Sequence, residues 1–364
     1  MDGYTFYNFA NHPTTQCCTS WYCSGLCLSK ASTKFYREWV SKIFLSSAVL
    51  ASISTALAEI LGAAIGIQML FKIPIPLGAI ISAAVSIFML FSNSYRKLER
   101  WIIAFVGIID ISFIFELALV KTSWFEVVKG WVMPSFPYGS TLIIMSVLGA
   151  VIMPHNLFLH SEIIQSRSWN LENEETIKRQ LKYEFIDTLF SMIAGWGINS
   201  AMIIVAAAVF FSRGIALSEL KTAQATLRPL LGNLASVVFA LALLFAGISS
   251  SITARMASGS IFAGMFGEPF DIHDNHSRIG VLIAIVLSTL IIFFLKDTFK
   301  GLIISQVILS IQLPWTILAQ IVLTSRVKVM GKYKNSKLES MILWTIFLIV
   351  SFLNVMLLLN IKSS

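Results

Sequence analysis

Apolar residues come in long runs along this chain, and short stretches rich in polar and charged residues separate the runs. Most runs are about 20 residues or longer, the length that an α-helix needs to cross the hydrocarbon core of a bilayer. The pattern predicts about nine membrane-spanning helices. The predicted spans are 43–71, a run from a 72–78 turn to 91, 101–120, 142–164, 185–211, 230–266, 279–295, 302–323 and 341–359.

The first forty residues lack such a run and are polar and aromatic instead. We therefore expect a polar, cytosolic and poorly ordered N-terminal segment (1–40), followed by a transmembrane domain (41–364). All four cysteines, Cys17, Cys18, Cys23 and Cys27, fall in this segment. Their spacing fits no strong zinc pattern, which normally has two closely spaced pairs. Free, reduced thiols are the expected state.

The composition agrees with a polytopic membrane protein. Apolar residues make up 56% of the chain, charged residues 13%, and the mean hydropathy is +0.79. Soluble domains carry about 25% charged residues. The net charge of +8 comes from Lys and Arg that gather in alternate loops, which indicates membrane topology rather than nucleic-acid binding. The predicted fold class is all-α.

The predicted span 142–164 is unusual because Pro154 interrupts its middle. Proline has no N–H, and its ring crowds the carbonyl four residues back, which belongs to Ala150. We expect the helix to break here and leave carbonyls without partners. Within a membrane, such a break is tolerated only where it lines a cavity or is buried in protein. Met153 adds a soft sulfur beside these carbonyls.

The same span holds two histidines, His155 and His160. Five residues place them about 140° apart around a helix, so they are expected on different faces. Ionisable groups at this depth are costly and usually mark a functional pathway. The alternative interpretation is a proline kink in a buried helix, with each histidine hydrogen-bonded to a neighbouring helix.

Three other spans carry polar side chains at depth: Glu59, Asn199, and the pair Gln306 and Gln312. Glu59 is either functional or a protonated, hydrogen-bonded structural residue. Asn199 and each glutamine are either site residues or interhelical hydrogen-bonding groups. The two glutamines are six residues apart, so only one can easily face a central site. Pro314 is predicted to free the carbonyl of Ser310.

The residues around Pro154 resemble the sixth-helix signature of the NRAMP family, the proton-coupled divalent metal transporters. That signature reads approximately A-x-x-M-P-H-x-x-Y-L-H-S, and 150–161 match it with Phe158 in place of Tyr. The resemblance implies a LeuT-type inverted-repeat fold. It also implies that the Ala150 carbonyl and the Met153 sulfur bind the metal, and that His155 and His160 lie on the proton route.

Three further stretches resemble other helices of this family. Residues 305–314, S-Q-V-I-L-S-I-Q-L-P, resemble the tenth helix and imply that Gln306 is a ligand in the occluded state. Residues 195–201 resemble the seventh helix, where Asn199 would contact the metal through water. The stretch A-L-A-E around Glu59 resembles the third helix and places Glu59 on the proton pathway.

The chain departs from the family pattern at specific positions. The Asp expected three residues before Glu59 is Ala56, the acid expected near Val85 is absent, and no Asp-Pro-Gly occurs in the chain. The resemblance therefore covers helices three to eleven of the family, over about residues 45–360, and predicts a truncated transporter. The remaining donors are neutral and offset little of the cost of desolvating a divalent ion, so we expect impaired affinity.

The leading hypothesis is an N-terminally truncated, proton-coupled transporter of Mn or Fe, because thioether sulfur favours these softer ions over Ca or Mg. It needs no cofactor beyond the transported ion and protons. The alternative is a non-transporting pseudo-transporter that associates with an intact relative, and an amino-acid transporter of the same architecture is weaker. We find no nucleophile–base pair in the sequence that would indicate an enzyme. The location is a multi-pass membrane protein of the plasma membrane or of an endosomal or vacuolar membrane.

Overall fold

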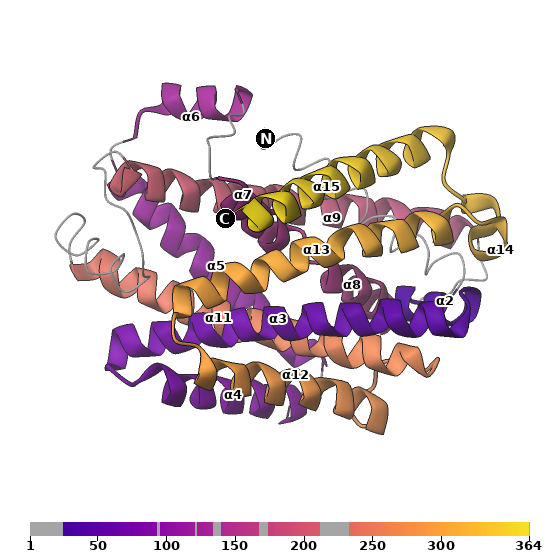
Figure 1. Cartoon of the computed structure of the whole chain (residues 1–364), viewed down its shortest axis with the longest axis horizontal. Coiled ribbons are helices and arrows are strands. Elements are labelled where there is room, and N and C mark those ends of the chain that lie inside the picture. Colours follow the sequence, from indigo (N-terminus) through magenta and orange to yellow (C-terminus); the bar gives the residue numbers. More distant parts are fainter. Residues whose placement is uncertain are drawn as a thin grey trace.

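A computed structural model describes residues 25–92, 95–120, 122–133, 140–166, 174–211 and 233–363. These residues form helices and no strands, and most of the helices run side by side along the long axis of the molecule (Figure 1). The helices are α2 (Leu28–Phe35), α3 (Glu38–Phe71), α4 (Ile75–Ser92), α5 (Tyr95–Leu119), α6 (Trp124–Val132), α7 (Thr141–Val151), α8 (Pro154–Ser166), α9 (Glu174–Val209), α11 (Asn233–Met265), α12 (Asn275–Phe294), α13 (Thr298–Thr324), α14 (Val327–Met330) and α15 (Lys337–Ser363), with a 3₁₀ turn at Gly331–Tyr333.

Nine segments of the described chain are long and apolar enough to cross a membrane, with α7 and α8 together forming one of them. Each matches one of the predicted spans, so the all-α class and the number of spans are confirmed. Several helices begin a turn or more before the predicted span, as α3 does at Glu38 and α9 at Glu174. Their first turns are charged, and pairs such as Glu38 and Lys42, whose Oε1 and Nζ are 2.6 Å apart, extend the helix beyond the apolar run.

α3 is the central helix, and its span is almost wholly buried. It packs most extensively against α11, and glycines make this close approach possible. A Cβ at Gly66 would lie 2.9 Å from the Leu244 nitrogen, and one at Gly247 would lie 2.5 Å from the Glu59 carbonyl oxygen. Small residues at such crossings allow two backbones to touch, which is how helices associate within a bilayer.

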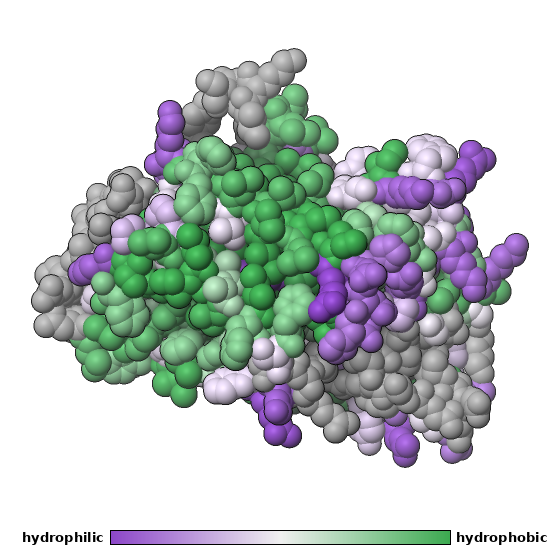
Figure 2. Space-filling model, turned by 90° about the horizontal axis from the view of Figure 1, so that it is seen from below, coloured by the Kyte–Doolittle hydropathy of each residue, from purple (hydrophilic) through white to green (hydrophobic). Residues whose placement is uncertain are grey.

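The outer helices, in contrast, present apolar side chains at the surface. Ile111 of α5, Phe190 of α9 and Phe294 of α12 are each at least two-thirds exposed. Figure 2 shows hydrophobic residues covering the middle of one face, with a group of hydrophilic residues toward one end. A surface of this kind suits a hydrocarbon environment, so the chain is an integral, multi-pass membrane protein.

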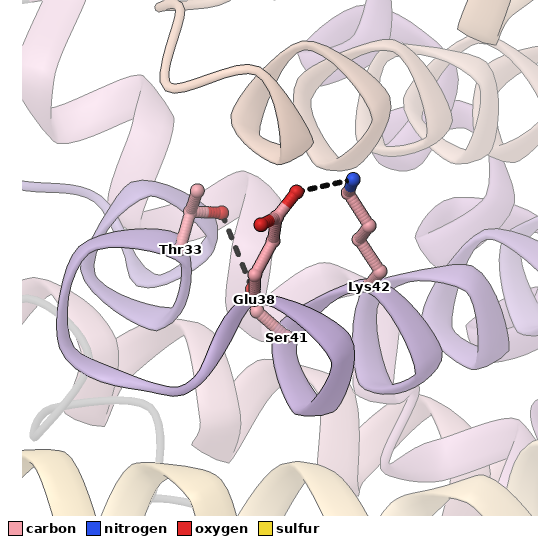
Figure 3. A network of polar contacts seen from close by, with 4 residues as sticks. All are labelled: Thr33, Glu38, Ser41 and Lys42. Carbon is pink, nitrogen blue, oxygen red and sulfur yellow. Dashed lines mark hydrogen bonds and ion pairs between the residues drawn. The ribbon is translucent and has the colours of Figure 1, made fainter.

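The short helix α2 packs onto the bundle beside the start of α3. The Leu28 N–H donates to Ser161 Oγ on α8 at 3.0 Å, and Thr33 Oγ1 donates to the Gly264 carbonyl on α11 at 2.7 Å. Figure 3 shows the turn between α2 and α3, where the hydroxyls of Thr33 and Ser41 are 3.3 Å apart. The described part of the N-terminal segment is therefore attached to the bundle, while the predicted division at residue 40 stays a prediction.

Cys27 stands just before α2 and is a free, fully buried thiol. Burial, together with the nearby Glu162 carboxylate, raises the pKa of Cys27. The thiol is therefore protonated at physiological pH and is a poor nucleophile or metal ligand. The other three cysteines, Cys17, Cys18 and Cys23, lie outside the described residues.

Two basic groups of the sequence meet at this end of the molecule. Arg326, which precedes α14, donates to the Phe35 carbonyl at 3.3 Å, and its guanidinium lies 5.8 Å from the centre of the Tyr36 ring. The basic residues before α3 and after α13 thus share one end of the bundle, where Figure 1 places α2 and α14. This agrees with the prediction that the basic loops lie on one side of the membrane.

Candidate metal site at a broken helix

The helix breaks where the sequence predicts. α7 ends at Val151, and Ile152 leaves the helical conformation with φ −109° and ψ 81°. α8 begins with Pro154 at its first position, where a missing N–H costs nothing. The Ile152 N–H still reaches the Leu148 carbonyl at 3.0 Å. In a continuous helix the Ala150 carbonyl would accept from residue 154, and proline has no N–H to donate to it.

Met153 lies in the gap between the two half-helices and is half-buried. The Asn156 side-chain nitrogen lies 3.5 Å from the Met153 sulfur, which holds the thioether near the start of α8. Asn156 itself is exposed. The half-buried Ala150 is three residues earlier, so a carbonyl oxygen and a soft sulfur flank one break.

α13 passes directly beside this break. A Cβ on Gly149 would overlap the Gln306 carbonyl oxygen and come within 3.0 Å of the Ser310 nitrogen. Only glycine permits this contact, and the contact brings Gln306 next to Ala150. The Gln306 Oε1 atom is buried and has no hydrogen-bond partner among the described residues. A buried amide oxygen costs free energy unless a hydrogen-bond donor or a cation binds it.

The second glutamine of α13 is turned elsewhere. Gln312 Oε1 accepts a hydrogen bond from Thr316 Oγ1 at 2.9 Å, one turn along the same helix. The described contacts therefore give Gln306, and not Gln312, a place beside the break. Whether Gln306 binds metal stays a prediction at this point.

The proline of α13 has a different outcome from Pro154. α13 continues through Pro314 without a break. The Ser310 carbonyl, which loses its helical donor, accepts instead from the Asn354 side-chain nitrogen at 3.0 Å. Asn354 comes from α15, so a neighbouring helix supplies the missing hydrogen bond. The sequence predicted the freed carbonyl but did not identify its new donor.

The two histidines of α8 lie on different sides of the helix, as their spacing predicts. His155 is buried, with Nδ1 3.4 Å from Thr55 Oγ1 on α3. His160 is part-exposed, with Nε2 3.1 Å from Glu184 Oε1 on α9. Glu184 is buried, and sequence reasoning missed it because the predicted span began one residue later. The signal that could have identified Glu184 was a carboxylate at the edge of an apolar run.

Glu59 lies one turn along α3 from Thr55 and is half-buried. No described residue forms an ion pair with its carboxylate within 4.0 Å. Ala56 is buried in the core beside Thr55, so the contact with His155 lies next to the position where the family pattern has an acid. The proton-pathway role of His155, His160 and Glu59 stays a prediction.

Asn199 lies on α9 and is half-buried. Its neighbours Ile198 and Ala201 pack with Phe113 of α5 and Ala242 of α11. This stretch of α9 therefore packs against α5 and α11. The predicted water-mediated role of Asn199 is not tested by these contacts.

The donors gathered at the break are all neutral: a carbonyl, a thioether and an amide. Among the described residues, no three His, Cys, Asp or Glu side chains converge in a way that could hold a metal ion. Such a donor set supplies no fixed negative charge that could offset the desolvation of a cation.

Comparison with known proteins agrees with this fold. A family model described as natural resistance-associated macrophage protein-like matches residues 22–360. The chain is 35% identical over 308 residues to the divalent metal cation transporter MntH of Caldanaerobacter subterraneus, covering 84% of this chain and 72% of that protein. It is 36% identical over 317 residues to the natural resistance-associated macrophage protein 2 homolog of Dictyostelium discoideum, covering 85% of this chain and 50% of that protein.

Two solved structures share the architecture. A mutant of the manganese transporter of Eremococcus coleocola matches with a TM-score of 0.80 and 25% identity, covering 97% of this chain and 78% of that one. Mhp1, a nucleobase-cation-symport-1 family transporter in a closed conformation, matches with a TM-score of 0.65 and 13% identity, covering 90% of this chain and 72% of that one. The second likeness bears on the fold alone.

Proposed function

The chain belongs to the NRAMP family, and on this premise we propose that it moves divalent transition-metal ions, manganese in particular, across a membrane through a site at the α7–α8 break. Its relatives include divalent metal cation transporters, and a manganese transporter has the same fold. These relatives are transporters and not enzymes. The observation that carries the proposal is the Ala150 carbonyl, whose helical donor is lost because residue 154 is proline, with Met153 beside it and α13 packed against the break.

The proposed ligands are the Ala150 carbonyl, the Met153 sulfur and the Gln306 amide oxygen. Two hard oxygens alone would not distinguish manganese from calcium. The thioether favours the softer transition ions, so Met153 sets the preference for Mn or Fe over Ca or Mg. Asn199 is proposed as a further, water-mediated contact.

Proton coupling is proposed to run along α8. His155 contacts Thr55 of α3, and His160 contacts Glu184 of α9, so the two rings connect the break to two different neighbouring helices. Histidine suits proton transfer because its ordinary pKa of about 6.5 is close to physiological pH. In a LeuT-type fold, one helix bundle then rocks against the rest and exposes the site to each side in turn.

Metal uptake into proteoliposomes that contain the purified full chain tests the proposal. Met153→Ala is expected to lower manganese uptake roughly tenfold and to let calcium compete better, because the soft ligand is lost. Met202→Ala is the matched control, since Met202 is an exposed methionine on α9 and its loss should leave uptake unchanged. Equal uptake by all three proteins would contradict a site at the break.

A second candidate function is regulatory. The neutral ligand set at the break and the alanine at position 56 favour a chain that associates with an intact transporter and changes its flux or abundance. Co-expression with an active relative tests this candidate. An unchanged flux and an unchanged amount of that relative would count against it.

A further inference from the structure

Arg255 is a fully buried charged side chain. It lies in the second half of α11 and has 0% relative exposure. None of its three guanidinium nitrogens has a hydrogen-bond partner among the described residues. It is also the one charged residue of α11. A buried guanidinium without a counter-charge carries a large desolvation penalty, so a second state in which it is paired is expected.

The residues next to Arg255 on α11 show which helices its side chain faces. Gly259 packs against Val281 and Ser277 of α12. The hydroxyl of Ser251, one turn before Arg255, lies 2.9 Å from the hydroxyl of Ser86 on α4. Gly247, about two turns before Arg255, meets the Glu59 carbonyl of α3. Together these neighbours place Arg255 toward α3, α4 and α12.

Those three helices offer a single acid at membrane depth. α4 and α12 contain no Asp or Glu. α3 contains Glu38 in its first turn and Glu59 in its buried middle. Glu59 is therefore the one carboxylate that the helices facing Arg255 can supply within the bilayer.

α5 and α8 meet α11 beside the residue that follows Arg255. Leu98 of α5 and Leu159 of α8 pack in one cluster with Met256, about a quarter turn of the helix away from Arg255. Glu162 of α8 is already engaged, since it accepts from Ser260 Oγ at 3.2 Å and from the Phe270 N–H at 2.9 Å.

The crossing of α3 and α11 sets the spacing between Glu59 and Arg255 along the two helices. The helices are antiparallel, because Gly66 of α3 meets Leu244 while Gly247 meets the Glu59 carbonyl. Arg255 is eight residues beyond Gly247, about 12 Å along α11. Side chains lean toward the N-terminus of their own helix, so in an antiparallel pair these two lean toward one another.

We propose that Glu59 and Arg255 are each other's counter-charge and form an ion pair across the α3–α11 crossing in a second conformation of the bundle. The described conformation holds them apart, with Glu59 half-buried and Arg255 buried without a partner. The hydroxyls of Ser86 and Ser251 lie at the level where the two side chains would meet. The second conformation rests on the alternating access of the proposed function, while the pair itself does not require metal transport.

A double-mutant cycle on the purified full chain tests the pair without relying on transport. The variants are Glu59→Gln, Arg255→Met and the double variant, and the readout is the apparent Tm in detergent, with and without MnCl₂. We expect Glu59→Gln to lower the Tm by about 5 °C, because it leaves Arg255 without a counter-charge in either conformation. Adding Arg255→Met to Glu59→Gln should then raise the Tm again.

Arg278→Met is the matched control, since Arg278 is exposed on α12 and should give the same small effect in both backgrounds. If Arg255→Met changes the Tm equally with and without Glu59, under both metal conditions, the pair does not form and the proposal is overturned.

Manganese uptake adds a second readout, which should not distinguish the two variants if Arg255 only packs against its neighbours. Arg255→Lys, which keeps the charge, should retain more than half of the wild-type rate, while Arg255→Met should lose most of it. Equal rates for these two variants would overturn the pair as part of the transport cycle. If the wild-type chain takes up no manganese, the proposed function fails, and the Tm cycle still decides the ion pair.

Discussion

Two prolines in this molecule remove the same hydrogen bond and produce opposite results. Pro154 deprives Ala150 of a donor, and the helix opens into α7 and α8. Pro314 deprives Ser310 of a donor, and α13 stays continuous because Asn354 of α15 provides an N–H at 3.0 Å. A proline inside a span is therefore not enough to predict a binding site. The absence of a replacement donor decides whether a carbonyl remains available for an ion.

The contact that holds the opened helix is expected to show the largest effect. Gly149→Val should destabilise the protein by about 3 kcal/mol, because its side chain overlaps the Gln306 carbonyl and pushes α7 away from α13. Thermal unfolding in detergent measures the change. Gly107→Val is the matched control, since a Cβ on Gly107 of α5 meets no atom within 4 Å. Equal losses in the two variants would show that α13 does not approach α7 this closely.

The donor that keeps α13 closed is expected to come next. Asn354→Leu should cost about 2 kcal/mol of stability, because the Ser310 carbonyl is then buried without a partner. The double variant Asn354→Leu with Pro314→Ala should recover most of this loss, since alanine restores an N–H at position 314. Thermal unfolding of the single and double variants measures both steps. A double variant no more stable than Asn354→Leu alone would argue against this explanation.

The same substitution at both prolines tests the comparison most directly. Pro154→Ala restores an N–H that can close on the Ala150 carbonyl, so manganese uptake should fall roughly tenfold, about 1.4 kcal/mol, without loss of thermal stability. Pro314→Ala should leave uptake unchanged, because the Ser310 carbonyl is already satisfied. Initial uptake rates in proteoliposomes distinguish the two. If both variants behave alike, the open carbonyl at 150 has no role in transport.

The sequence predicts the parts of this structure that depend on local chemistry. Long apolar runs predict the spans, and the missing N–H of Pro154 predicts the break. The five-residue spacing predicts that His155 and His160 face different helices, and the structure confirms this with Thr55 on one side and Glu184 on the other. Each of these predictions needs only residues that are neighbours along one helix.

The parts that escaped prediction depend on residues far apart in the chain. Asn354 lies 44 residues from the carbonyl that it satisfies, and nothing in its own helix indicates that role. Glu184 belongs to the charged part of α9 that precedes the apolar run, so hydropathy alone left it out of the predicted span. The close contact at Gly149 needed knowledge of which helix passes beside it, because a glycine in a span signals a close approach without naming the partner.

α8 is fixed to the bundle at one end, so a small tilt of this helix moves its other end much further. Its far end is fixed, since Ser161 accepts from Leu28 of α2 and Glu162 accepts from the backbone of Phe270. Its near end carries Met153, eight residues away and so about 12 Å from that pivot. A tilt of about five degrees would move the sulfur by about 1 Å, several times the tolerance of a metal–ligand bond. Under the proposed function, a small rotation at Ser161 and Glu162 would be enough to release an ion bound to Met153.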